Sequence, residues 1–315
     1  MERLNSFAKK KVQFAPLLMA GLLIFSACKP SEEVIPEETE VSENGNQTGN
    51  ETETPNPNPG GGSSVTEGYY ADEIQKIAAS SSCSTYSWAN RGKAPMAYMK
   101  GMALTFAKSY CRLRTTEASP TGIVNILVRP SGSATSDALA HYQSTYKSLG
   151  MDITSNKAEI LKSLYTLGVG LGMRETSGKY CTGRDTSASN TSASTAEAGL
   201  FQTSYNSMSA STELRNLFME YKADPSKCFL DVFKVGVSCS NTSIYGTGEG
   251  AEYQAFNKSC PAFATEYAMM MLRLRRNHYG PINRQEAQII SSCNKMLSDV
   301  QAFLDRDLNG CDEVI

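Results

Sequence analysis

One carboxyl group, Glu175, follows a stretch made almost entirely of apolar residues and glycines, LYTLGVGLGM at 164–173. Burial against apolar neighbours raises the pKa of a carboxyl group, so a glutamate in this place can keep its proton near neutral pH and donate it. Two further acids follow, Asp185 in TGRD and Glu197 in TAEAG. Paired carboxyl groups perform general acid–base chemistry. The alternative for Glu175 is a structural glutamate that faces solvent or bonds to a helix end.

The apolar stretch before Glu175 belongs to a predicted helix. Asn156 and Glu159 have the Asn-x-x-Glu spacing of a capping box. They precede an apolar stripe at helical intervals, formed by Ile160, Leu161, Leu164 and Leu167. Glu175 is therefore expected at or just past the C-terminal end of a core helix. Space for a backbone or a sugar to approach this helix is expected at Gly168, Gly170 and Gly172.

The remaining periodicity is also mostly helical. Helices are predicted over 71–83, 94–113, 212–222 and 261–276, and a last helix follows a second capping box, Asn283-x-x-Glu286, and is closed by Asn309-Gly310. A short strand is predicted at 122–129, where the residues are apolar and β-branched. Residues 182–211 are rich in Ser, Thr and Asn and predict a long loop or a small irregular lobe. The sequence thus indicates a mainly α domain with a small irregular or β element.

Two short motifs occur in order, RETSG at 174–178 and EAGLFQTS at 197–204. Together they resemble the lysozyme-like superfamily, especially bacterial lytic transglycosylases and goose-type lysozymes. In that family a Glu-Ser or Glu-Thr at a helix end precedes a Gly-Leu-Met-Gln loop. The resemblance implies a lysozyme-like helical domain that cleaves the β-1,4 glycosidic bonds of peptidoglycan strands. It also implies that Glu175 is the general acid that protonates the leaving oxygen.

Several residues are expected to contact the substrate, and the resemblance implies the first of them. Gln202 matches the glutamine of the family and would line the cleft, and Gly199 permits the tight loop before it. Ser177 in the first motif and Tyr205 directly after the second are expected to contact sugar. Tyr279, in the segment RRNHYGP, is expected to stack on a sugar ring.

The second carboxylate is where the sequence departs from the family pattern. Goose-type enzymes carry an aspartate two places after the glutamine, and this position is Ser204 here. Asp185 is the favoured base and Glu197 the alternative, since one of them must activate water in an inverting hydrolase. Without a base, the 6-hydroxyl of the sugar would attack and give the anhydro product of lytic transglycosylases. A hydrolase specific for chitosan or deacetylated glycan and a non-catalytic wall-binding protein are further alternatives.

The first 66 residues indicate export and anchoring. A basic start and the apolar stretch VQFAPLLMAGLLIFSA end at Cys28 in FSAC, which resembles a bacterial lipobox. Residues 1–27 are therefore predicted to be a lipoprotein signal peptide, and lipid on Cys28 would hold the protein to a membrane. Residues 28–66, with eight Glu residues and the run PNPNPGGGSS, predict a disordered tether. Residues 67–315 are the predicted lysozyme-like domain, located in the cell envelope, in the periplasm or at the outer membrane.

Composition disfavours several other functions. Eight cysteines follow Cys28, an even number that predicts up to four disulfides in an exported protein, with the pairing left open. From residue 55 onward the chain has 25 Lys and Arg against 23 Asp and Glu, which is too balanced for a nucleic-acid-binding surface. The two histidines, His141 and His278, have no spacing typical of metal ligands. Together with the resemblance, which implies binding to glycan strands, these observations lead us to expect a monomer that needs no metal or cofactor.

Overall fold

The helix that carries Glu175 is the central element of the fold. In the computed structural model, which describes residues 68–116, 118–185, 192–307 and 309–314, α7 spans Lys157–Thr176. It begins as predicted, because the side-chain oxygen of Asn156 accepts hydrogen bonds from two backbone N–H groups of the first turn, at 2.9 and 3.1 Å. Every residue from 160 to 173 is buried. Glu175 therefore lies in the last turn of a core helix, where the apolar stretch predicted it.

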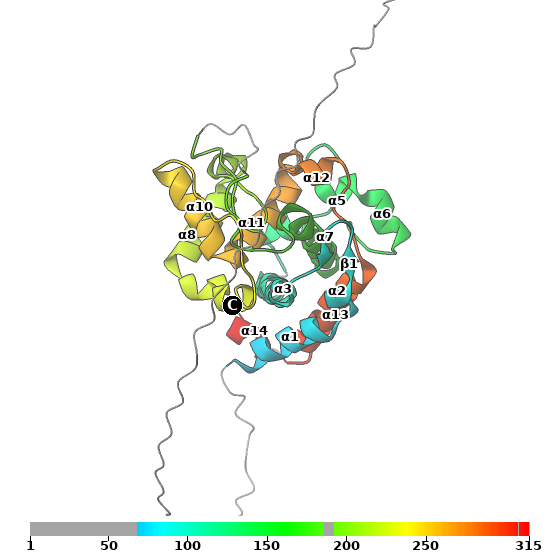
Figure 1. Cartoon of the computed structure of the whole chain (residues 1–315). Coiled ribbons are helices and arrows are strands. Elements are labelled where there is room, and N and C mark those ends of the chain that lie inside the picture. The colour runs from blue at the N-terminus through cyan, green and yellow to red at the C-terminus, as the bar shows by residue number, and fades with distance from the viewer. Residues whose placement is uncertain (1–67, 117, 186–191, 308, 315) are drawn as a thin grey trace, which may run out of the picture. The chain divides into compact units, whose positions relative to one another are not determined.

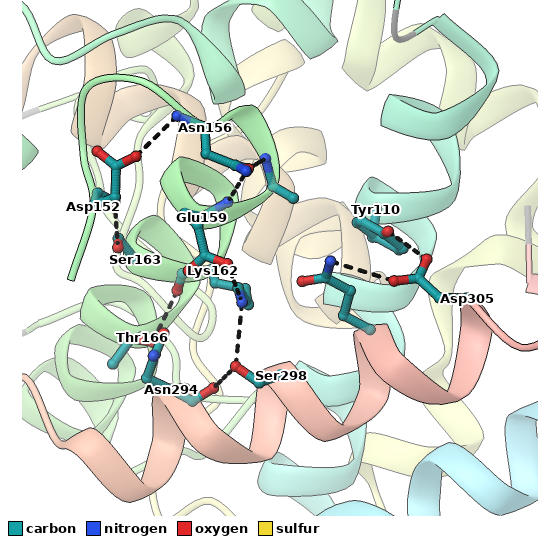
Figure 2. Close-up of polar contacts among 12 residues, drawn as sticks. Tyr110, Asp152, Asn156, Glu159, Lys162, Ser163, Thr166, Asn294, Ser298 and Asp305 are labelled. Carbon is teal, nitrogen blue, oxygen red and sulfur yellow. Dashed lines mark hydrogen bonds and ion pairs between the residues drawn. The ribbon is translucent and has the colours of Figure 1, made fainter. Parts of the chain in front are cut away.

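Polar side chains attach the N-terminal half of α7 to its neighbours, as Figure 2 shows. The carboxylate of Asp152 accepts a hydrogen bond from the backbone of Asn156 at 2.9 Å. Lys162 donates to Ser298 Oγ at 3.2 Å, and Ser298 lies on α13 (Ser291–Leu304). These contacts fix the orientation of α7, which matters because a rotation of the helix would move the carboxyl group at its far end.

Three long helices form the core, and the other helices surround them. α3 (Met96–Thr116) and α11 (Pro261–Leu274) both pack against α7, and most of their residues are buried. α13 contacts α3 and α7, and α1 (Tyr69–Ser80) lies beside α3 and α13 (Figure 1). The prediction of a mainly helical domain is confirmed, since 63% of the structure is helix and 3% is strand.

The remaining elements are short. β1 (Ser87–Trp88) and β2 (Gly92–Lys93) pair in antiparallel orientation, with Ser87 opposite Lys93 and Trp88 opposite Gly92. The shorter helices are α2 (Ser82–Thr85), α4 (Gly122–Val128), α5 (Ala138–His141), α6 (Gln143–Ser148), α8 (Thr212–Ala223), α9 (Leu230–Phe233), α10 (Glu249–Ser259), α12 (Gly280–Asn283) and α14 (Gly310–Val314). The 3-10 helices are η1 (Tyr205–Ala210), η2 (Pro225–Cys228) and η3 (Arg276–His278). The described residues of the predicted irregular lobe, 182–185 and 192–211, hold η1 and an isolated β-bridge, as an irregular lobe would.

Residues 122–129 contain a helix, so the strand predicted there is wrong. α4 packs against α3, α7, α8 and α11, and its buried side chains are Val124, Ile126, Leu127 and Val128. A short apolar run suits a buried helix as well as a strand, and only the surrounding elements decide between them. Pro120 and Pro130 flank the segment and keep the helix to about two turns.

The last long helix differs at both ends from its prediction. α13 begins well after Glu286, and no side chain caps it. The side chain of Asn283 accepts a hydrogen bond from an arginine at 2.5 Å, and Glu286 forms ion pairs with two arginines, so Asn283-x-x-Glu286 is not a capping box. At the other end, α13 stops at Leu304, and Gly310 starts α14 instead of closing α13. The spacing of Asn283 and Glu286 fits a cap, but their side chains make other contacts.

The eight cysteines of the described residues form four disulfides, as their even number predicted. The pairs are Cys83–Cys293, Cys111–Cys311, Cys181–Cys239 and Cys228–Cys260. The first two join cysteines that are 210 and 200 residues apart, and so tie the start of the folded chain to its end. In the chain-entropy description, a cross-link over a loop of that length stabilises the fold by about 5 kcal/mol.

The predictions for residues 1–67 lie outside the described residues. They comprise the signal peptide at 1–27, the lipid on Cys28 and the tether at 28–66. All described residues fall within one structural unit. Among the helices of this described part, none combines the length and the apolar composition that a membrane crossing requires.

Candidate active site

Glu175 is half-buried in the last turn of α7. Burial, and then the negative charge of Glu197, raise the pKa of Glu175 to about 7. The positive charges of Arg91, Arg174 and Arg284 act in the opposite direction. A large share of the Glu175 side chains is therefore protonated at neutral pH. A carboxylic acid that keeps its proton at this pH can serve as a general acid.

Neighbouring segments pack closely against the glycines of α7. A Cβ at Gly170 would lie 2.1 Å from the backbone oxygen of Gln288, and a Cβ at Gly172 would lie 2.4 Å from the hydroxyl of Tyr98. The expected approach of a backbone is thus confirmed at Gly170. The expected approach of a sugar to this helix is wrong, because protein atoms already fill the space.

The second motif, EAGLFQTS, forms a tight turn against the end of α7. The backbones of Ala198 and Thr203 exchange two hydrogen bonds, at 3.1 and 3.2 Å. Gly199 and Gln202 adopt left-handed φ values of 78° and 46°. Glycine is required at position 199, because a Cβ there would also lie 2.9 Å from the side chain of Asn257. Gly199 therefore contributes by allowing the backbone conformation of the turn.

Hydrogen bonds join this turn to α7 and to the segment that follows α7. The hydroxyl of Thr176 donates to the carbonyl oxygen of Leu200 at 2.9 Å. The side-chain amide of Gln202 donates to the carbonyl oxygens of Gly199 at 2.9 Å and Gly183 at 3.4 Å. The motifs RETSG and EAGLFQTS are thereby held against each other.

A pocket of about 290 Å³ lies where these three segments meet. It brings together four residues that the sequence predicted, namely the three carboxyl groups and the glutamine. Its lining residues are Glu175, Thr182, Gly183, Arg184, Asp185, Glu197, Gln202 and Asn241. Carboxylates that share one pocket repel one another, so loss of a proton from one makes the next harder to remove.

Glu197 is the second carboxyl group of the pocket with a shifted pKa. Its side chain is 34% exposed. Burial and the charge of Asp185, which is exposed, raise the pKa of Glu197 to about 7. Nε2 of His278 lies 3.9 Å from a carboxylate oxygen of Glu197. Burial lowers the pKa of His278, so its ring is neutral at pH values near 7.

Tyr279 lies inside the protein and not on the surface of the pocket. It is 2% exposed, so its ring has no open face for a sugar, which corrects the predicted stacking. Its hydroxyl has no hydrogen-bond partner among the residues that the structure describes. Burial raises the pKa of Tyr279, and the charges of Glu175 and Glu197 add to the shift. Tyr279 therefore keeps its hydroxyl proton at neutral pH.

Two other predicted contact residues do not line the pocket. Tyr205 lines a separate hollow that also includes Arg215, and its hydroxyl donates to Glu249 at 2.7 Å. Ser177 ends α7 with a left-handed φ of 56° and is absent from the pocket wall. Neither residue therefore lies in the wall of the pocket that holds Glu175.

The wall of the pocket that contains Asn241 was not predicted from the sequence. The disulfide Cys181–Cys239 joins two segments there, and the backbone N–H of Gly183 donates to the carbonyl oxygen of Asn241 at 2.8 Å. The backbone of Arg184 accepts a hydrogen bond from the Asn241 side chain at 2.7 Å. The two cysteines were the available signal, but sequence alone does not say which cysteines pair.

Other candidate sites carry less chemistry. Within the described residues, no group of three or more His, Cys, Asp or Glu side chains is arranged to hold a metal ion. A larger hollow of about 740 Å³ lies between α1 and α13 and contains none of the predicted site residues. No protein family, curated protein or solved structure matches the chain.

Proposed function

We propose that this protein is a glycosidase that cleaves the β-1,4 bonds of peptidoglycan, with Glu175 as the general acid. One observation carries the proposal: Glu175, with a pKa of about 7, shares a pocket with a second carboxyl group, Glu197, whose pKa is also about 7. Glycoside hydrolysis needs one carboxyl group that protonates the leaving oxygen and a second that activates water or stabilises the sugar cation. The resemblance of both motifs to lysozyme-like enzymes supports the choice of substrate.

The second carboxyl role fits Glu197 better than Asp185. Glu197 is half-buried, and its negative charge raises the pKa of Glu175 directly. Ionised Glu197 therefore helps Glu175 to keep the proton that it must donate. Asp185 is exposed, and its charge raises the pKa of Glu197. Replacing Glu197 by Gln is expected to lower the rate far more than replacing Asp185 by Asn.

A lytic transglycosylase is the second candidate, and the pKa of Glu197 favours it. At a pKa of about 7, Glu197 is partly protonated at neutral pH and is then a weak base for water. In this alternative, Glu175 first donates its proton to the leaving oxygen. Its carboxylate then takes the proton of the 6-hydroxyl as that oxygen attacks the anomeric carbon. The product is lighter by one water than the product of hydrolysis.

The expected location is also a proposal. Four disulfides are typical of proteins of oxidising compartments, which supports export. We propose that lipid on Cys28 anchors the protein in the cell envelope and that the acidic segment after it holds the domain toward the wall. Labelled palmitate should enter the wild type and not Cys28→Ser, and equal labelling of both would contradict the anchor.

Purified sacculi and mass spectrometry of the released fragments test the activity. Glu175→Gln is expected to lower the cleavage rate by about 100-fold or more, since it removes the proton donor. Glu252→Gln is the matched control, because Glu252 is an exposed glutamate on α10. A Glu175→Gln protein that cleaves as fast as this control would exclude Glu175 as the acid.

The products separate the remaining alternatives. Fragments with reducing ends indicate hydrolysis, and anhydro ends indicate transglycosylation. Cleavage restricted to deacetylated wall or chitosan would replace the substrate in this proposal by a glycan with free amino groups. Wild-type protein that binds sacculi and releases no fragment would contradict the glycosidase and indicate a wall-binding protein.

A further inference from the structure

Three arginines from separate elements act on Glu175 and are linked to one another by hydrogen bonds, directly or through Glu286. Arg91 lies in the turn between β1 and β2, Arg174 lies in the last turn of α7, and Arg284 directly follows α12. Nη2 of Arg91 donates to the carbonyl oxygen of Arg174 at 2.5 Å. All three lie close enough to Glu175 for their charges to act on it.

The positive charge of this group is only partly balanced. Glu286 accepts from Arg174 Nη2 at 2.9 Å and from Arg284 Nε at 2.7 Å. In the part of the chain that the structure describes, Glu286 forms ion pairs with Arg174 and Arg284, and no carboxylate lies within ion-pair distance of Arg91. Arg91 is exposed, and the Arg284 side chain is 61% exposed. Two arginines thus present N–H groups to solvent, with one carboxylate for three positive charges.

These positive charges make Glu175 a weaker proton holder than burial and Glu197 alone would make it. Positive charges beside a carboxyl group favour its ionised form, whereas a general acid must keep its proton. A negative charge placed on Arg91 and Arg284 would cancel this influence on Glu175. The arrangement therefore suits a substrate that carries its own anion.

We propose that Arg91 and Arg284 form a binding site for a carboxylate that the glycan substrate carries beside the bond to be cleaved. This inference rests on the proposed glycosidase and adds the chemical class of its substrate. The planar guanidinium group binds carboxylates through paired N–H groups. Arg174, which Glu286 holds in place, supports Arg91 through its carbonyl oxygen. In peptidoglycan the carboxylate belongs to the stem peptide, or to the lactyl group where the peptide has been removed.

Three glycans of equal length test this site. They are peptide-bearing glycan, the same glycan stripped by an amidase so that its lactyl carboxylates are free, and an N-acetylglucosamine oligosaccharide without carboxylates. The wild type is expected to show a kcat/KM about tenfold higher for a carboxylate-bearing glycan than for the neutral one, and the preference should weaken at high salt. A preference for the peptide-bearing glycan over the stripped one assigns the carboxylate to the peptide, and the reverse assigns it to the lactyl group.

The variant Arg91→Gln/Arg284→Gln is expected to lose the preference, so that the ratio of its kcat/KM values for carboxylate-bearing and neutral glycan falls to about one. Arg91→Lys/Arg284→Lys should keep part of it, because lysine keeps the charge and loses the planar fork. Arg306→Gln, an exposed arginine after α13, is the control and should keep all of it. A wild type without the preference, or a double glutamine variant that retains it, would overturn the carboxylate site.

Calorimetric binding of the same three glycans separates this inference from the proposed function. Binding that prefers carboxylates and needs both arginines would support the site even if no bond is cleaved. If cleavage depends on Glu175 but neither the rate nor the affinity differs between carboxylate-bearing and neutral glycans, the proposed glycosidase is supported and the carboxylate site is refuted.

Discussion

The hydroxyl of Thr176 donates a hydrogen bond of 2.9 Å to the carbonyl oxygen of Leu200. Thr176 is the last residue of α7 and directly follows Glu175, and Leu200 lies in the turn that directly follows Glu197 in the chain. The bond therefore ties together the two segments that carry the carboxyl groups of the pocket. Their electrostatic interaction depends on this junction, because charge effects weaken with distance.

Thr176→Val is expected to weaken the junction. Valine has nearly the same shape but cannot donate, so the buried carbonyl oxygen of Leu200 loses a partner, at a cost of about 1–3 kcal/mol in the free energy of unfolding. The cleavage rate should fall as well, because the turn is held less firmly. Urea unfolding and turnover on sacculi measure both effects. Thr176→Ser keeps the hydroxyl and is the control, and equal losses in the two variants would contradict this role.

Glu175→Gln is expected to stabilise the fold at alkaline pH. The pKa of Glu175 is about 7 in the folded state, against an ordinary value of 4.5 for a glutamate, so the folded state holds this proton more tightly than the unfolded chain. The stability that the proton contributes is fully present below about pH 4.5 and is lost as the pH rises to about 7.

Glutamine resembles the protonated acid, so this variant should not lose stability in that pH window. Its Tm should equal that of the wild type at about pH 4 and exceed it at about pH 8. Thermal unfolding at the two pH values measures the difference. A Tm difference that does not change with pH would show that Glu175 is not held protonated by its surroundings.

Gly170→Ala is expected to destabilise the fold more than Gly168→Ala. The new Cβ at position 170 would lie 2.1 Å from a backbone oxygen, that of Gln288, which cannot move without shifting the chain. The Cβ at position 168 would meet the flexible end of Met269 at 2.4 Å. We expect a loss of about 1–3 kcal/mol for Gly170→Ala and a smaller one for Gly168→Ala. Both sites are interior positions of α7, so the two variants gain equally in helix propensity. Equal unfolding midpoints would contradict the close contact between Gly170 and the Gln288 backbone.

The disulfide Cys181–Cys239 is expected to matter more for activity than for stability. It joins cysteines 58 residues apart beside the pocket, whereas Cys111–Cys311 joins cysteines 200 apart in α3 and α14. Replacing each pair by serines should lower Tm more for the longer loop. The cleavage rate should fall more for Cys181→Ser/Cys239→Ser, because Gly183 and Arg184 lose their anchor. Equal activity of the two variants would show that the disulfide does not shape the pocket.

Local patterns in the sequence determined the helix that carries Glu175. The cap at Asn156 and the apolar run up to residue 173 depend on near neighbours in the chain, so they predict a core helix without knowledge of the rest. The even number of cysteines likewise predicted up to four disulfides, although not their pairing. Where a local pattern was ambiguous, as in the apolar run at 122–129, the prediction of a strand failed.

The tertiary structure alone decided which side chains meet Glu175. Glu197 reaches the pocket as a half-buried carboxyl group while Asp185 stays exposed, and the sequence favoured the opposite assignment of roles. Tyr279 has an aromatic ring of the kind that stacks on sugars, but this ring is buried, and the charges of Glu175 and Glu197 act on its hydroxyl. The arginines beside Glu175 come from residues 91, 174 and 284. Burial and charge depend on contacts between segments that are distant in sequence, and periodicity and spacing contain no information about those contacts.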